Sequence, residues 1–190
     1  AGGFWYAPAG TAVPTDATSA LPETFVSGGY LSDDGITNSR DRDDVTVNAF
    51  GGDLVLSATS SVTETVQFGL LETTYDALAL VYGTNNVTKD ASGNITVKHN
   101  AKDPAHIVGV VELALTGDRV KRIVLPDAQV GDVDDVEYQD GEAITYTPTL
   151  SCYPDAAGNF AYEYIAKVAA SPSTPPSGGS GSGESSGGKQ

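Results

Sequence analysis

The sequence predicts a mainly β fold, a sandwich or barrel of many short strands, with one α-helix. Two observations indicate this class. Segments of alternating apolar and polar residues recur at near-regular spacing, and turn-forming residues separate them. In one segment, residues 72–83, the apolar residues change to helical spacing. At 190 residues, the chain has the length of one domain with a sizeable core.

Residues 1–22 are rich in Ala, Gly, Pro and Thr, and we expect an extended N-terminal arm there rather than a regular element. The arm carries three consecutive aromatic residues, Phe4, Trp5 and Tyr6. Such a cluster usually anchors a segment, either to its own core or to a neighbouring subunit. We therefore predict that these three residues anchor the arm.

A strand pattern of period two runs through residues 45–70. The helix is expected directly afterwards, within residues 72–83, because Tyr75, Leu78, Ala79 and Tyr82 fall at helical spacing. Thr73 or Thr74 is the expected N-cap, and Gly83 stands where a glycine ends a helix.

Later segments return to strand patterns. Residues 87–99 and 106–125 each predict a hairpin, and residues 130–166 predict three more strands. Turns are expected at residues 90–94, 117–118, 140–141 and 154–158. Residues 171–190 have too few apolar side chains to offset the entropy of ordering, which predicts a flexible tail or a linker. The predicted parts are the arm (1–22), the β domain (23–170) and the Gly/Ser/Pro-rich tail (171–190).

The net charge of −15, from 25 acidic and 10 basic residues, argues against a surface that grips DNA or anionic lipid. It suits a protein that lets nucleic acid pass without binding it. Arg119, Lys121 and Arg122 form the one basic cluster, and we expect it to pair with acids across an interface. No apolar run approaches the roughly 20 residues of a membrane span.

Acidic residues around Gly35 raise the question of a calcium loop. The candidate ligands are Asp33, Asp34, Asp41, Asp43 and Asp44. They stand largely in adjacent pairs rather than at alternating positions, and no Glu closes the run. Arg40 and Arg42 lie among them, where they would repel a cation. We therefore expect a solvated or partner-facing loop and no metal.

Catalytic and cofactor-binding motifs are not found in the sequence, so we predict no enzyme activity and no cofactor. His99 and His106 lack a nucleophile motif and are expected as polar residues at strand ends. Cys152 is expected to be a small buried apolar residue. Paired carboxylates leave a hydrolase open as a distant alternative.

Five segments, taken in order, resemble motifs of one family. They are Ala7–Asp16, Gly28–Thr37, Val47–Asp53, Phe68–Gly83 and Arg119–Val130. Together they resemble the major tail protein, or tail tube protein, of long non-contractile-tailed bacteriophages, especially those of actinobacterial hosts. The resemblance covers roughly residues 3–168.

The resemblance implies a β-sandwich or barrel of the tail tube type with one flanking helix. Six copies would form a ring whose inner sheets join into a continuous β-barrel, and the rings would stack into a tube through which DNA passes during ejection. Implied partners are further copies of the chain and the tape measure, distal tail and tail terminator proteins. The implied location is the virion tail, after assembly in the bacterial host cytoplasm.

The resemblance also implies roles for particular residues. Ser32–Phe50 is the best candidate for a long loop that reaches the adjacent ring, with its Asp and Arg residues forming charge pairs that fix register. The N-terminal aromatics and the C-terminal tail could likewise reach neighbouring subunits. Asp132, Asp134 and Glu137 are candidates for lumen acids that repel DNA, with an outward-facing position as the alternative.

One alternative class is a β-sandwich adhesin or carbohydrate-binding module. It would need clustered exposed aromatic residues, and Tyr153, Tyr162 and Tyr164 would be its best platform. A secretion-system tube protein of related fold is a closer alternative, although the arm motif favours a phage protein.

Overall fold

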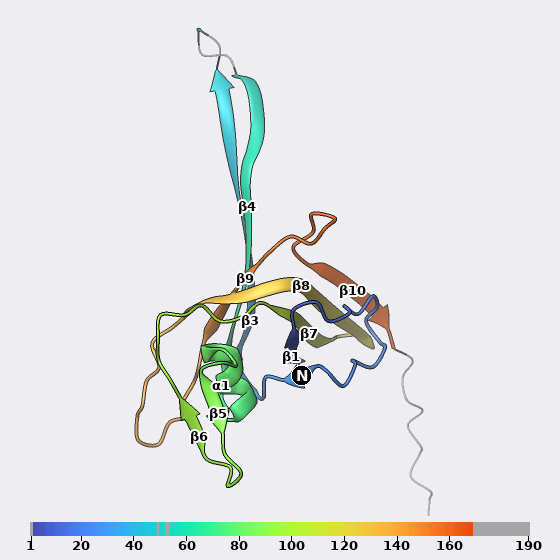
Figure 1. Ribbon diagram of the computed structural model, residues 1–190. Coiled ribbons are helices and arrows are strands. Elements are labelled where there is room, and N and C mark those ends of the chain that lie inside the picture. The colour runs from blue at the N-terminus through green and yellow to red at the C-terminus, as the bar shows by residue number, and fades with distance from the viewer. Residues whose placement is uncertain (1, 49, 52–53, 169–190) are drawn as a thin grey trace, which may run out of the picture.

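Ten strands and one helix make up the part of the chain that the computed structural model describes, residues 2–48, 50–51 and 54–168. They are β1 (Gly2–Pro8), β2 (Val26–Ser27), β3 (Leu31–Asn48), β4 (Leu54–Leu70), α1 (Tyr75–Tyr82), β5 (Val87–Lys89), β6 (Ile95–Val97), β7 (Ile107–Leu115), β8 (Arg119–Val133), β9 (Pro148–Cys152) and β10 (Tyr162–Lys167). The predicted class, mainly β with one helix, is confirmed (Figure 1).

Strand β8 joins the two halves of an eight-stranded antiparallel sheet of order β2-β1-β7-β8-β9-β4-β3. Its residues 119–128 pair with β7, and β10 pairs along the other edge of residues 119–124. Its residues 128–133 pair with β9. Each half of β8 thus belongs to a different part of the sheet, and the two parts enclose a core. Strands β5 and β6 form a separate hairpin.

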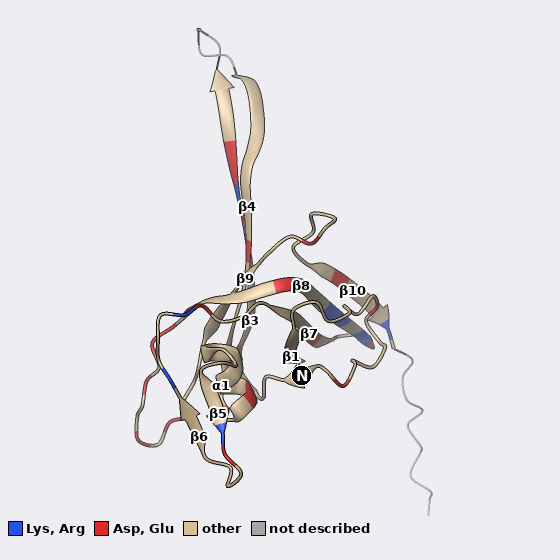
Figure 2. Cartoon of the chain, viewed as in Figure 1, with Lys and Arg blue, Asp and Glu red and all other residues tan. Residues whose placement is uncertain are grey.

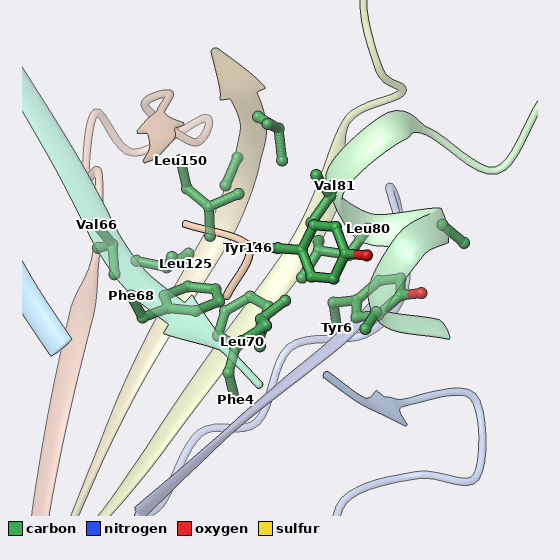
Figure 3. Packing of buried hydrophobic residues seen from close by; sticks show 14 of the residues in the cluster. Phe4, Tyr6, Val66, Phe68, Leu70, Leu80, Val81, Leu125, Tyr146 and Leu150 are labelled. Atoms are coloured by element: carbon green, nitrogen blue, oxygen red, sulfur yellow. The ribbon is translucent and has the colours of Figure 1, made fainter. Parts of the chain in front are cut away.

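The main core receives side chains from both parts of the sheet and from α1 (Figure 3). Phe4 of β1 and Phe68 of β4 have ring centroids 4.4 Å apart. Leu125 of β8 and Leu150 of β9 are fully buried beside them. Residues from distant parts of the chain therefore meet in one sandwich core.

A smaller core lies on the other face of β1, β7 and β8. Its buried members are Ala7, Phe25, Val108, Val110 and Val124. Trp5, Leu21, Tyr162 and Tyr164 pack around it. Both faces of this part of the sheet are thus covered, one by β4, β9 and α1 and the other by the chain between β1 and β2.

Helix α1 lies within the predicted segment, residues 72–83. Thr74 is the N-cap, and its hydroxyl accepts a hydrogen bond from the Ala77 amide at 3.3 Å. Gly83 follows the helix with a φ of 87°, a backbone conformation that favours glycine. The Tyr6 hydroxyl donates to the Asp76 carbonyl at 2.8 Å and ties β1 to the first turn.

The predicted hairpins at residues 87–99 and 106–125 are confirmed as β5/β6 and β7/β8. Of the three strands expected in residues 130–166, only β9 and β10 are separate elements. The prediction of the first strand as a separate element is wrong. Residues 130–133 are the end of β8, where that strand pairs with β9. Residues 134–145 are mostly exposed and contain no strand.

The expectation that residues 1–22 contain no regular element is wrong for β1. This strand lies inside the sheet between β2 and β7, and its alternate residues enter the two cores. A strand buried on both faces shows no apolar–polar alternation, so the usual sequence signal is missing. The Trp5 ring lies over Gly3, where a Cβ would be 2.4 Å from the ring. The division into arm, domain and tail stays a prediction, and the tail at 171–190 lies outside the described residues.

Candidate assembly surfaces

Strands β3 and β4 form a long hairpin that projects from the body (Figure 1). The expected loop Ser32–Phe50 is therefore wrong in its form, because residues up to Asn48 belong to β3. In the body, β4 pairs with β9 only through Glu64–Gln67. Its residues 54–63 pair with β3 alone, and at roughly 3.3 Å per residue they extend the hairpin by about 30 Å.

The charged residues of β3 concealed its strand character from the sequence. A ribbon that has solvent on both faces needs no apolar–polar alternation, so the usual signal for a strand is missing. Backbone pairing sets the register instead, with a bulge where Asp43 pairs with Ser61 and Asp44 with Thr59. Ser60 is the extra residue of that bulge, on β4.

The hairpin charges form short-range contacts within the chain. Arg42 Nε lies 3.4 Å from Asp44 Oδ1 and the Arg42 guanidinium also donates to the Thr59 hydroxyl. The Asp43 carboxylate accepts from the Ser61 hydroxyl at 2.9 Å, and Arg40 pairs in register with Glu64. Because these side chains are exposed, such contacts contribute little to folding, at most about 1 kcal/mol each.

Position along β3 divides the seven predicted loop residues into two groups. Asp41, Arg42, Asp43 and Asp44 lie along the projecting stem, and Arg40 lies at its base, where its partner Glu64 still pairs with β9. Asp33 and Asp34 lie at the root, where the register shifts between Leu31 and Ile36. Their role between rings stays a prediction.

The outer part of the hairpin is apolar, a feature that the sequence reading had not recognised as a surface. Val45, Val47, Phe50, Val55 and Leu56 are all exposed, and Phe50 is fully so. Val47 pairs with Leu56, so their side chains share one face of the ribbon. The alternation of period two that begins at Val45 was the sequence signal that could have revealed this surface. An isolated two-stranded ribbon is marginally stable in water, and exposed apolar patches of this kind often mark protein contacts, so this tip is a candidate surface for another protein.

The basic cluster divides into a buried and an exposed part. Arg122 is 3% exposed, and its guanidinium contacts Glu112 Oε1 at 2.5 Å. It also donates to the carbonyls of Asp16 at 2.9 Å and Ser19 at 2.7 Å. The expectation that Arg122 pairs across an interface is therefore wrong, because its partners belong to its own chain. It holds the segment between β1 and β2 against the sheet.

Arg119 is exposed and Lys121 is half-buried, and both lie on the face of β8 opposite to Arg122. Figure 2 shows basic residues at this end of β8, beside β10. Lys121 Nζ is 2.8 Å from Glu163 Oε1. The pairing of β8 with β10 brings Lys167 opposite Arg119, a neighbour that could not be inferred from its distant place in the sequence.

The three candidate lumen acids lie in the last residues of β8 or shortly after it. Asp132 is in the strand and exposed, whereas Asp134 and Glu137 come after it. Asp134 accepts from Gln67 Nε2 at 3.2 Å, which links it to β4. Glu137 accepts from Gln139 Nε2 at 2.8 Å and lines a shallow groove of about 210 Å³. Their position relative to a lumen stays a prediction.

The N-terminal aromatic residues do not share one environment. Phe4 and Tyr6 are buried in the main core of their own chain. Trp5 points to the other face, is partly exposed and borders an open cavity. Of the three, Trp5 alone has a surface that can still face a neighbouring subunit.

The possible carbohydrate platform is divided between two environments. The rings of Tyr162 and Tyr164 are parallel, 6.4 Å apart, and pack against the smaller core. The Tyr162 hydroxyl donates to Asp155 at 2.5 Å. Tyr153 instead packs on His106, with ring centroids 4.9 Å apart. Among the described residues, no contact of Tyr162 or Tyr164 favours a role in sugar binding over packing against the smaller core.

Among the described residues, no group of three His, Cys, Asp or Glu side chains is placed to hold a metal ion. The one helix in this part of the chain is not long and apolar enough to cross a membrane.

His106 Nδ1 lies 2.6 Å from Asp127 Oδ1. Burial raises the pKa of the Cys152 thiol to about 12, which disfavours the reactive thiolate.

These features define a β-sandwich with one helix and a projecting hairpin whose exposed apolar tip suits protein contacts. A family model described as phage tail tube protein matches residues 1–175. The chain therefore belongs to the phage tail tube protein family, and the resemblance stated from the sequence is confirmed. A search of curated protein sequences found no match. Family membership gives the chain a structural role in a tail tube, self-assembly with other tail components and a place in the virion tail.

Proposed function

We propose that this chain assembles into six-membered rings that stack into the tube of a long non-contractile phage tail, through which DNA passes during ejection. The observation that carries this proposal is the β3/β4 hairpin, which extends about 30 Å beyond its pairing with β9 and ends in exposed apolar residues. In a tail tube protein, such an element can reach a subunit of the adjacent ring.

The two faces of the hairpin stem have different charges. Because the extra residue at the bulge lies on β4, the period of two continues along β3. Asp41 and Asp43 therefore share one face, whereas Arg40, Arg42 and Asp44 share the other. Charge patterns of this kind select the partner and its register more than they add affinity.

The acidic balance supports passage of DNA. With a net charge of −15, the chain repels the phosphate backbone, so a tube built from it lets DNA slide. We assign Asp132, Asp134 and Glu137 to the lumen as part of this proposal. The tube would meet the tape measure, distal tail and tail terminator proteins, and assembly would occur in the host cytoplasm.

Negative-stain electron microscopy of the purified protein across a concentration series tests the proposal. We expect six-fold rings or hollow tubes at high concentration, or after addition of tail lysate as a template. Persistent monomers under every condition, together with binding to glycans, would contradict it.

A paired substitution tests the hairpin. Arg40→Glu with Arg42→Glu should lower the fraction of protein in stacked rings, because it reverses charge on one face of the stem. The free energy of unfolding should change by less than about 1 kcal/mol, since these side chains are exposed. Lys89→Glu with Lys98→Glu, on and beside the β5/β6 hairpin, is the matched control. An unchanged tube yield would count against the inter-ring role of the stem.

A further inference from the structure

We propose that the uncharged segment after β10, residues 169–176, folds back and docks in the open cavity beside β1 of its own chain. This cavity lies on the face of the sheet that carries the smaller core, and Trp5, Leu21 and Val120 are among its walls. Docking within one chain requires neither rings nor tubes. The inference therefore goes beyond the proposed function and can be tested separately from it.

The end of β10 brings the chain to this cavity. Ala166 pairs with Val120, which lines the cavity, so the even-numbered residues of β10 point to the same face. Val168 continues this alternation, because its amide donates to the Asp118 carbonyl at 2.7 Å and its exposed side chain lines the cavity. The residues that follow Val168 therefore start at the edge of the cavity, and no second chain is needed to bring them there.

The cavity has a volume of about 670 Å³ and offers an aromatic, largely apolar lining without unpaired charge. The Trp5 ring lies over Gly3, and both residues line the cavity. Of the charged lining residues, Arg122 and Glu112 pair with each other at 2.5 Å. Lys121 points to the opposite face of β8 and has its ion-pair partner on β10. An occupant without charge therefore suits this lining.

The segment after Val168 has the composition of such an occupant. Residues 169–176, Ala-Ala-Ser-Pro-Ser-Thr-Pro-Pro, contain three prolines and no charge, whereas residues 177–190 are mainly Gly and Ser. Proline favours the polyproline II conformation, which loses little entropy on binding and is recognised by aromatic-lined grooves. The family model matches up to residue 175, so nearly all of the proline-containing segment belongs to the family's domain.

The segment is also long enough to reach Trp5. From β10 across β8 and β7 to β1 there are three strand spacings, together about 14 Å. Eight residues in polyproline II conformation extend about 25 Å. The docked segment would cover the Trp5 ring and complete the smaller core at its open end.

Fluorescence of Trp5 tests the docking, because this is the only tryptophan in the sequence. In the full chain, Pro172→Asp with Pro175→Asp should shift the emission to longer wavelength and raise the acrylamide quenching constant about twofold, since charged residues disfavour an apolar site. The matched control, Ser180→Asp with Ser182→Asp, adds the same charge to the Gly/Ser tail and should change neither quantity. Far-ultraviolet circular dichroism checks that both variants keep the sheet. Equal quenching in the two variants would overturn the docking.

Disulfide trapping locates the segment. One variant combines Ser173→Cys with Ala114→Cys, at an exposed position that lines the cavity. The matched control combines Ser173→Cys with Leu115→Cys, which is also exposed but points to the other face of β7. On oxidation, the first variant should form its intramolecular disulfide at least about tenfold faster than the control, because docking raises the effective concentration of one thiol at the other. The native Cys152 is buried and does not compete.

The outcomes separate this proposal from its alternatives. Equal rates in the two double variants would overturn the docking, because the segment would then visit both faces alike. Disulfide-linked dimers that form in place of the intramolecular bond would show that a second copy fills the cavity, which also overturns it. Both experiments use dilute protein, below the concentration at which rings or tubes appear. An intramolecular disulfide in a chain that never forms tubes would support the docking and contradict only the proposed function.

Discussion

Replacing Arg122 by Met should destabilise the folded chain far more than the same change at its neighbour Lys121. The Arg122 side chain is 4% exposed and forms an ion pair with Glu112. The same guanidinium holds the segment between β1 and β2 against the sheet. Removing the guanidinium leaves the Glu112 carboxylate without its counter-ion, and it releases the carbonyls of Asp16 and Ser19.

The magnitude follows from the burial of each partner. Breaking a buried ion pair by removing one member costs about 3–5 kcal/mol. Because Glu112 is 34% exposed, water can partly solvate the remaining charge, so we expect the low end, about 3 kcal/mol. The freed carbonyls lie in an exposed segment and regain hydrogen bonds to water. Lys121→Met removes a contact to Glu163, which is 50% exposed, and should cost less than about 1 kcal/mol.

Urea denaturation of the monomer, followed by tryptophan fluorescence, measures both changes, and Trp5 lies beside the affected segment. A third variant, Arg122→Met with Glu112→Leu, removes the stranded charge and should recover more than about half of the loss. A loss below about 1 kcal/mol in Arg122→Met, or no recovery in the double variant, would refute the assignment of this ion pair as the clamp.

Three further predictions concern separate features. Thr74→Ala removes the N-cap acceptor of the Ala77 amide and should lower the free energy of unfolding by about 1 kcal/mol in urea titrations. Cys152 should react with a thiol reagent at pH 8 only after unfolding, since burial raises its pKa to about 12; fast labelling of the native protein would contradict this. Hydrogen bonds from the hydroxyl and amide of Ser19 lower the pKa of Asp16 below its ordinary 3.8. Its stabilising effect is therefore present above the unfolded pKa and lost as pH falls, so thermal unfolding of Asp16→Asn should depend less on pH below about 4.

Local features of the fold could be predicted from the sequence because a few neighbouring residues determine them. The β5/β6 and β7/β8 turns contain glycines at positive φ, Gly93 and Gly117, and helix α1 has its cap and its final glycine within one short segment. These signals do not depend on which strands pair with which. The family motifs extended the prediction to the tail tube fold, which the family match supports.

The other features of the fold depend on contacts between residues that are distant in the sequence. Strand β1 is buried on both faces, and β3 is exposed on both, so neither shows the alternation that marks a half-buried strand. The candidate surfaces were only partly predictable for the same reason. The acids and arginines of the stem are visible in the sequence, but the juxtaposition of Lys167 with Arg119 exists only through the pairing of β10 with β8.

The strand geometry of the β3/β4 hairpin also limits the lengths that such a hairpin can have. Two residues added to each strand would lengthen it by about 7 Å and keep every side chain on its present face. One residue added to each would exchange the faces and turn Asp41 and Asp43 away from whatever they now meet. If neighbouring rings are held together through this hairpin, the two-residue period of its strands determines which hairpin lengths preserve the contact. The distance between rings could then change in evolution only by discrete steps, with a matching change in the surface that receives the tip.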